Sequence, residues 1–308
     1  MSRLPTLGIL VSLLCFTAGT AAAQTVVIDR VEDLESDRPE AWSMRYFTSI
    51  SLLSGLGSPQ AMEPGSWEIG FEGGWVPSLS ERERRVGFNG SKLEDLNKTS
   101  AFGRPRVTVG LPKKLSLTLS WAPPIEIGGV KPNLFAAALG RPLWTGDSWR
   151  LGWRLYAQTG TLEGDLTCDR DTVAAGDDPV RNPFRCEEVS NDEVTMDYLG
   201  FEISTARRSQ GRLEPHFALA VNSLDTEFQV GARYFGVVDQ TLLRADDTTV
   251  SLTVGLNYHA SDRWRLAGEL FYSPLGDVSR RTSPEGSTFV SGSEELFHVR
   301  GMITYRVR

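Results

Sequence analysis

The chain has 308 residues and a formal net charge of −7, and 23% of its residues are charged. An acidic chain without a basic cluster is unsuited to nucleic acid, so we exclude that class of partner. After the N-terminal region no apolar run of about 18 residues occurs, and the sequence therefore predicts no transmembrane helix. A β-barrel in lipid remains compatible with this composition, because only alternate residues of its strands meet the lipid.

The first 23 residues have the order of a secretory signal peptide. Arg3 supplies a short positive region, residues 7–16 form an apolar stretch, and residues 21–23 are alanines suited to cleavage. The apolar stretch is too short to anchor the chain in a membrane as a helix. Cys15 follows Leu14 instead of the small residue that a lipoprotein signal needs. The sequence predicts cleavage after residue 23 and export of residues 24–308.

Cleavage leaves two cysteines, Cys168 and Cys186, within one polar segment of the exported chain. An oxidising compartment favours their pairing as a disulfide. A metal site would need further ligands, and no histidine lies in that segment. We expect a disulfide here, and neither a metal nor a cofactor.

Residues 24–64 form a separate N-terminal segment with a predicted helix. Four of its apolar residues lie at helical spacing: Trp42, Tyr46, Ile50 and Leu53. Asp37 as the N-cap, followed by Pro39, would begin a helix that runs to about residue 53. Its apolar stripe could plug the remaining structure, cap its periplasmic mouth or lie on the membrane. A strand through residues 44–52 is the alternative.

From Trp67 onward, segments of about ten residues alternate apolar and polar side chains. In the first, Trp67, Ile69 and Phe71 share one face, and Glu68 and Glu72 share the other. A period of two residues indicates β-strands. About eleven such segments are clear: 67–75, 104–111, 115–121, 130–141, 149–156, 194–206, 213–221, 228–234, 250–258, 264–272 and 297–307.

The lengths of the connections predict the topology. Long polar connections occur at 80–100, 162–192 and 274–292, and short ones near 112–114, 142–148, 207–212 and 260–263. Outer-membrane barrels have long outer loops, short periplasmic turns and an even number of strands. All long connections lie outside only if a twelfth strand occupies the weaker stretch 237–244. We expect an all-β, antiparallel up-and-down transmembrane barrel of about 12 strands over residues 65–308.

A soluble β-sandwich or periplasmic barrel would also alternate. Large apolar residues on one face of every strand favour the membrane, and so do aromatic residues at the strand ends. In this topology Trp67, Trp149, Tyr258, Trp264 and Tyr305 lie at periplasmic ends, and Trp75, Trp121 and Tyr272 lie at outer ends. Two aromatic belts are typical of proteins that span a bilayer.

The C-terminal segment FHVRGMITYRVR (297–308) resembles the last strand of Gram-negative outer-membrane proteins, with Tyr305 and Val307 on its apolar face. Residues 264–275 are similar to a porin-type strand. The resemblance is to the porin-like class and to no specific family, and the chain departs from it by ending in Arg308 instead of phenylalanine. It implies a location in the bacterial outer membrane, contact with outer-membrane lipid and insertion by the barrel assembly machinery.

Many charged residues share the inward face in this register. They are Glu68, Glu72, Arg104, Arg106, Arg150, Arg154, Glu202, Glu214, Arg233, Arg265, Glu269, His298, Arg300 and Arg306. Buried charges need partners or water. Two interpretations stay open: an ion-pair network that closes a narrow lumen, or a pore lining with a basic bias toward anions.

Catalytic chemistry has little support in the sequence. The histidines are His216, His259 and His298, and none stands with a serine in a recognisable catalytic motif. Their spacing also does not suit zinc. We expect no enzyme. The main hypothesis is a porin-like channel for small solutes, with anions favoured. The alternatives are a structural or surface-binding barrel acting through its long loops, and a lipid-modifying enzyme.

Overall fold

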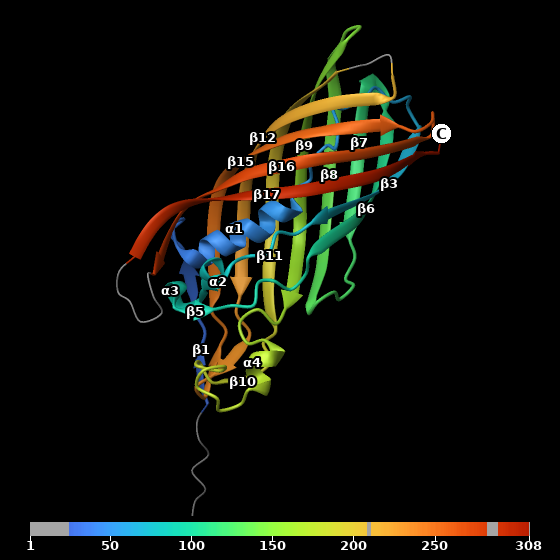
Figure 1. Cartoon of the computed structure of the whole chain (residues 1–308). Coiled ribbons are helices and arrows are strands. Elements are labelled where there is room, and N and C mark those ends of the chain that lie inside the picture. The colour runs from blue at the N-terminus through green and yellow to red at the C-terminus, as the bar shows by residue number, and fades with distance from the viewer. Residues whose placement is uncertain (1–24, 208–210, 282–288, 308) are drawn as a thin grey trace, which may run out of the picture.

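The computed structural model describes residues 25–207, 211–281 and 289–307. The predicted signal peptide lies outside the described residues. Within them, ten antiparallel strands form a ring that closes where β12 pairs with β15 (Figure 1). In ring order they are β3 (Trp67–Trp75), β6 (Ala101–Leu111), β7 (Leu115–Ala122), β8 (Val130–Thr145), β9 (Trp149–Gly164), β11 (Asp192–Arg207), β12 (Leu213–Gln229), β15 (Leu242–His259), β16 (Trp264–Arg281) and β17 (Phe289–Arg306).

The prediction of about twelve strands is therefore wrong by two. β12 continues without a break through residues 222–227, whose polar composition separated two strands in the sequence. Asn222 faces the lumen there and accepts a hydrogen bond from the Tyr156 hydroxyl, while Asp225 faces outward. The predicted strands at 228–234 and 237–244 do not cross the barrel. Because both drop out together, the number of strands stays even. The predicted long connection at 274–292 is also wrong, since β16 extends to Arg281 and β17 begins at Phe289.

Those residues instead contribute to a small sheet beyond one end of the ring. Its order is β1 (Val26–Ile28), β14 (Val237–Asp239), β13 (Ala232–Tyr234) and β10 (Cys186–Glu188). Beside it, α4 (Arg170–Ala174) lies in the connection between β9 and β11. The predicted disulfide between Cys168 and Cys186 is present in this connection, and its Cα atoms are 5.7 Å apart.

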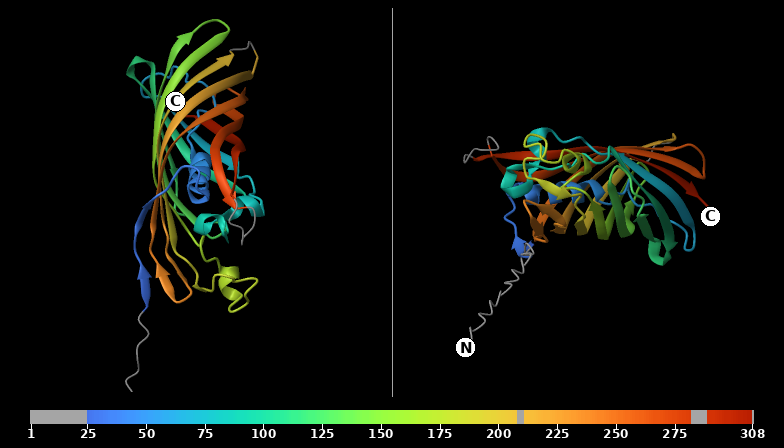
Figure 2. Two further views of the ribbon diagram at one scale, coloured as in Figure 1. Left: turned by 90° about the vertical axis from the view of Figure 1, so that its left-hand side faces the viewer. Right: turned by 90° about the horizontal axis from the view of Figure 1, so that it is seen from below.

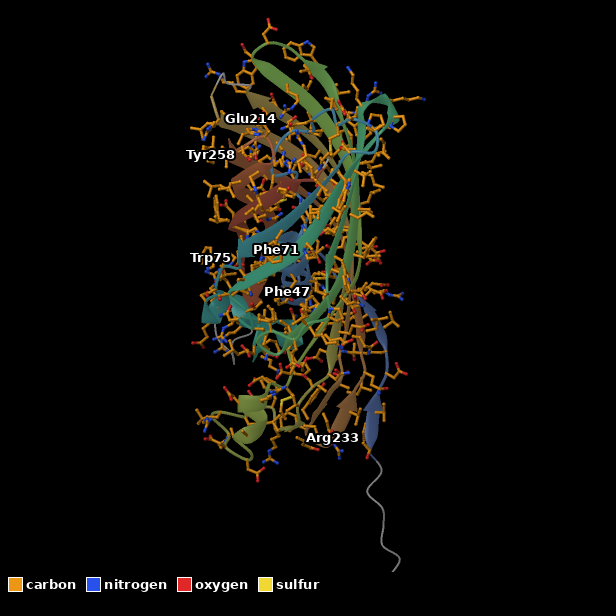
Figure 3. All side chains as sticks on the ribbon, turned by 90° about the vertical axis from the view of Figure 1, so that its right-hand side faces the viewer. Phe47, Phe71, Trp75, Glu214, Arg233 and Tyr258 are labelled. Carbon is orange, nitrogen blue, oxygen red and sulfur yellow. A yellow bond between two sulfur atoms is a disulfide. The ribbon has the colours of Figure 1, made fainter. Side chains whose placement is uncertain are left out.

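The two ends of the barrel differ. The end with the small sheet, which we call the cap end, also carries α2 (Glu81–Arg84), β4 (Arg85–Val86), α3 (Gly87–Gly90) and β5 (Lys92–Leu93). The opposite end, the turn end, has short connections such as η1 (Pro112–Lys114) and holds the C-terminus (Figures 1 and 2). Figure 3 shows Arg233 at the cap end, and Glu214 and Tyr258 toward the turn end.

The outer surface of the ring carries an apolar band. On β12 the outward residues Leu213, Phe217, Leu219 and Val221 are 43–51% exposed. The stretch that they cover is about 26 Å long, similar to the apolar band of membrane barrels. Toward the cap end the next outward residues of this strand are polar, beginning with Ser223. The strands therefore extend past the apolar band on the cap side.

Helix α1 (Pro39–Ser51) lies inside the ring (Figures 1 and 2). Asp37 is not its N-cap as predicted, because the helix begins after Arg38 and no side chain caps it. Asp37 instead accepts hydrogen bonds from Ser279 of β16. Beyond α1, residues 52–66 lead to β3, which begins at the turn end. No helix of the described residues is long and apolar enough to cross a membrane.

Candidate functional site

Four wall arginines bind the end of α1 inside the barrel. The donors and the carbonyls that accept from them are Arg104 with Ser51 and Leu52, Arg106 with Ser54, Arg154 with Leu53, and Arg300 with Ser49, Ile50 and Leu52. The bonds from Arg104 and Arg106 are 2.8–3.2 Å long. The last carbonyls of a helix lack partners within it and form the negative end of its dipole. The guanidinium groups satisfy both needs and hold the N-terminal segment in the lumen.

Glu72 of β3 is the central counter-charge of these arginines. Its side chain is fully buried, and its Oε2 accepts from Arg104 Nε at 2.6 Å and from Arg106 Nε at 2.8 Å. Arg300 lies 4.1 Å over the ring of Phe271, and Arg154 lies 3.5 Å from Glu202. The polar groups of the wall thus face one another and the part of the N-terminal segment inside the lumen. We call this part, α1 and the residues that follow it up to 62, the plug.

The other predicted inward residues also lie on the lumen side and have partners. Arg150 contacts Glu214 at 2.6 Å, Glu269 contacts Ser54 and lies 3.7 Å from His216, His298 Nδ1 lies 2.6 Å from the Trp75 carbonyl, and Arg265 and Arg306 lie 3.3 and 2.9 Å from Glu68. These partners come from strands far apart in sequence.

Arg233 does not line the lumen as predicted. It lies in β13 of the small sheet, where it contacts Glu187 at 2.8 Å and Glu188 at 3.2 Å. The turn around Phe235 and Gly236, both with positive φ, reverses the chain before it can cross the barrel. Residues 232–234 therefore belong to a short hairpin outside the ring, whereas residues 228 and 229 are the last two of β12.

The sequence did not predict the arrangement of Ser54, Glu269 and His216, because these residues are far apart in the chain. Ser54 donates to Glu269, whose other oxygen lies 3.7 Å from His216 Nε2. A nucleophilic serine needs a base that takes its proton, usually a histidine. Here the serine donates to the carboxylate, and all three side chains are buried under the plug. This geometry offers no activated serine to a substrate.

A cavity of about 260 Å³ lies at the cap end, above the first turns of α1. Its apolar lining consists of Met44, Phe47, Val86, Phe88, Leu96, Leu166, Val194, Phe228, Val230 and Leu243. We call it the cap-end pocket. Sequence reasoning missed it, because α1, the wall strands and the long connections each contribute only a few of these residues. The only signal was the unpartnered apolar stripe of the predicted helix.

Four of the charged residues that line the cap-end pocket pair with one another, whereas Glu94 pairs with Lys92 and Asp239 accepts hydrogen bonds from Tyr234 and Thr241. Arg38 lies 3.1 Å from both Glu32 and Glu40, and Arg30 lies 3.2 Å from Glu32. Glu40 also accepts a hydrogen bond from the backbone N–H of Asn89. These charges are neutralised locally, so the pocket presents mainly apolar surface to a ligand.

Glu94 lies in the wall of this pocket, within residues 84–96, which we call the cap. It makes the stability of the cap depend on pH. Burial raises the pKa of its carboxyl from the ordinary value of 4.5 to about 7, although the contact with Lys92 opposes the shift. Between these pH values the folded cap holds a proton that the unfolded segment releases. The contribution of Glu94 to stability is therefore complete below about pH 4.5 and is lost as the pH rises toward 7.

We expect hydrogen exchange in residues 84–96, corrected for its intrinsic pH dependence, to show a less stable cap at pH 8 than at pH 5. Glu94→Gln should remove this difference, because the amide does not titrate. The control is Glu81→Gln, since the Glu81 side chain is 66% exposed. The same pH dependence in wild type and Glu94→Gln would contradict the assignment.

No protein-family profile and no curated protein matches the chain. Solved structures do match. The outer-membrane protease OmpT of Escherichia coli is 10% identical, with a TM-score of 0.40 over 79% of this chain and 94% of that one. The toluene transporter TbuX of Ralstonia pickettii is 10% identical, with a TM-score of 0.34 over 82% and 92%.

The translocator domain of the autotransporter NalP of Neisseria meningitidis is 9% identical, with a TM-score of 0.39 over 80% of this chain and 90% of that one. The chain resembles Gram-negative outer-membrane β-barrels. These neighbours include a protease, a transporter and a translocator, so the likeness concerns architecture and not activity.

Proposed function

We propose that this chain is an outer-membrane barrel that binds a small, mostly apolar molecule in the cap-end pocket. The observation that supports this proposal is an apolar cavity of about 260 Å³. Acidic and basic residues at its edge form ion pairs with one another. A dry apolar cavity of about 150 Å³ is enough to bind benzene. The cap-end pocket thus suits a molecule with one or two rings. This function differs from the porin-like channel that the sequence favoured. It is related to the alternative, a structural or surface-binding barrel acting through its long loops, because residues of the long connections line the pocket.

The apolar band supports the outer-membrane location within this proposal. Its outward leucine, valine and phenylalanine side chains match the lipid-facing surface of membrane barrels. Insertion would use the barrel assembly machinery, whose recognition signal the C-terminal strand resembles. The cap end, with its long connections and disulfide, would then face the outside of the cell.

A gated channel for small anions is the second candidate. A polar space of about 80 Å³ lies below the plug, and Arg106, Arg154 and Arg265 line it together with residues 55–62. This space supports a passage only if the N-terminal segment moves, because Arg106 and Arg154, two of the arginines that would select anions, bind that segment. We do not propose an enzymatic activity, because the contacts of Ser54 do not activate it as a nucleophile.

Binding of fluorobenzene tests the proposed function. We expect saturable binding to wild type in lipid nanodiscs, followed by ¹⁹F NMR. Val194→Phe should weaken it at least about tenfold, because the added volume fills the pocket that Val194 lines. Val221→Phe is the matched control, since Val221 faces outward in the apolar band. Equal, non-saturable signals from all three proteins would reduce the effect to partition into lipid and contradict the proposal.

A further inference from the structure

The barrel wall is split between β15 and β16 on its cap side. The two strands pair from Leu252 and Tyr272 down to His259 and Arg265. Toward the cap end, β15 pairs with β12 and β16 pairs with β17. Among the described residues, the cap-side parts of β15 and β16 form no ladder with each other. We call this opening the seam.

A bulge in β16 explains the seam. The register of β16 against β17 shifts between Pro274 and Gly276. Proline has no N–H to donate to a neighbouring strand, and Gly276 has φ +77°, a conformation that favours glycine. A bulge bends its strand, so β16 turns away from β15 at this point.

The N-terminal segment fills the seam on the side of β15. Residues 31–38, which we call the strap, contain β2 (Val31–Asp33), which pairs in parallel with residues 242–244 of β15. The Leu34 N–H then donates to the Arg244 carbonyl at 2.8 Å. The strap thus takes the place that β16 has left.

On the side of β16 the strap is held at one residue. The Ser279 N–H donates to the Asp37 carbonyl at 2.8 Å, and the Ser279 hydroxyl donates to Asp37 Oδ2 at 2.7 Å. Directly after this contact the chain enters α1. The N-terminal segment therefore reaches the lumen through the wall and not over the rim, as the two views of Figure 2 allow the reader to follow.

The strap is also one wall of the cap-end pocket. Glu32 and Arg38 line the pocket, and Leu34 packs against an apolar cluster that contains Met44 and Ala245. Val31 remains 58% exposed. The strap is held by a short ladder with β15, one contact to β16 and a hydrogen bond from Arg45 to the Ser36 carbonyl. A segment with so few contacts belongs to the part of a fold that opens at low cost.

The seam is closed below the strap. The hydroxyls of Thr249 and Ser273 are 2.9 Å apart, and Arg45 forms an ion pair with Asp247. At this level the outward face of β15 is already polar, with Asp246 exposed. An opening at the strap would therefore face the aqueous side of the membrane and not its hydrocarbon core.

We propose that the strap is the gate of the cap-end pocket. The ligand enters sideways through the seam when the Asp37–Ser279 contact breaks and residues 31–38 withdraw from β15 and β16. The nature of the ligand rests on the proposed function, whereas the entrance rests on the strand pairing and the contacts of the strap. When the strap closes again, it restores its contacts with β15 and β16 and covers Met44.

Thiol labelling tests the gate without a ligand. Met44→Cys places a reporter behind the strap, and methyl methanethiosulfonate is the probe. Adding Asp37→Ala should raise the labelling rate about tenfold, because the strap loses a charged hydrogen bond to β16. The matched control, Asp33→Ala, alters an exposed carboxylate of the same strap. Heat-dependent gel migration confirms that each variant is folded. An unchanged rate with Asp37→Ala would overturn the gate.

A disulfide between Asp37→Cys and Ser279→Cys provides the converse test. Cross-linking should slow the exchange of fluorobenzene about tenfold, with its equilibrium affinity unchanged, and reduction should restore the rate. Unchanged exchange in the cross-linked barrel would place the entrance elsewhere. If fluorobenzene binds none of the proteins, the proposed function fails, and the labelling of Met44→Cys still decides whether the strap opens.

Discussion

Glu72→Ala is expected to lower the free energy of unfolding by about 3–5 kcal/mol. Glu72 is fully buried between Arg104 and Arg106, and both guanidinium groups donate to its Oε2. Removing the carboxylate leaves these cations buried with carbonyl oxygens as their main remaining acceptors. Urea unfolding in detergent micelles, followed by tryptophan fluorescence, measures the change.

The control for this prediction is a carboxylate in an exposed ion pair. Glu163 lies 2.9 Å from Lys131, and both side chains are 43% exposed. Glu163→Ala should cost less than about 1 kcal/mol, because solvent screens such pairs. If Glu72→Ala costs no more than Glu163→Ala, the arginines do not depend on Glu72, and Glu72 is not the central counter-charge of the lumen.

Arg104→Ala combined with Arg300→Ala is expected to open a conducting path through the barrel. These side chains donate five of the hydrogen bonds to carbonyl groups that retain the end of α1. Each buried carbonyl left unsatisfied costs about 1–3 kcal/mol. We expect wild type to show no steady conductance in planar bilayers. The double variant should show stable steps in at least about ten times as many insertions, since the N-terminal segment leaves the lumen more often.

Arg265→Ala is the control for the conductance measurement. It removes a lumen arginine whose carboxylate partner is Glu68 of the wall and not a carbonyl of the plug. This variant should remain closed. Steady conductance of wild type equal to that of the double variant would favour the porin-like channel over the plugged barrel. A double variant that stays closed would show that contacts other than these arginines retain the plug.

Local sequence predicted the strands and their facing because both are local properties. Successive side chains of a strand point to opposite faces, so the alternation in residues 250–258 indicates both a strand and its outward side. The same register placed Arg104, Arg154 and Arg300 on the inward face. It failed at Asn222 and Asp225, since polar residues on both faces resemble a turn where the strand has passed the apolar band.

The partners of the inward residues could not be predicted in this way. Arg300 binds carbonyls of residues 49, 50 and 52, about 250 positions away in the sequence. Such contacts depend on the placement of α1, and its apolar stripe was equally compatible with the lumen, the periplasmic mouth and the membrane surface. The cap-end pocket depends on the same placement, because Met44 and Phe47 line it from α1.

The sequence by itself predicted export of the chain, and it determined alternating strands with an apolar outer face, a charged inner face and one disulfide. Those features follow from residue type and spacing. Only the tertiary structure decided the number of strands, the plug and the strap, because each depends on where distant edges meet. Pro274 and Gly276 bend β16 away from β15, and the edge left open is where residues 31–38 enter the barrel.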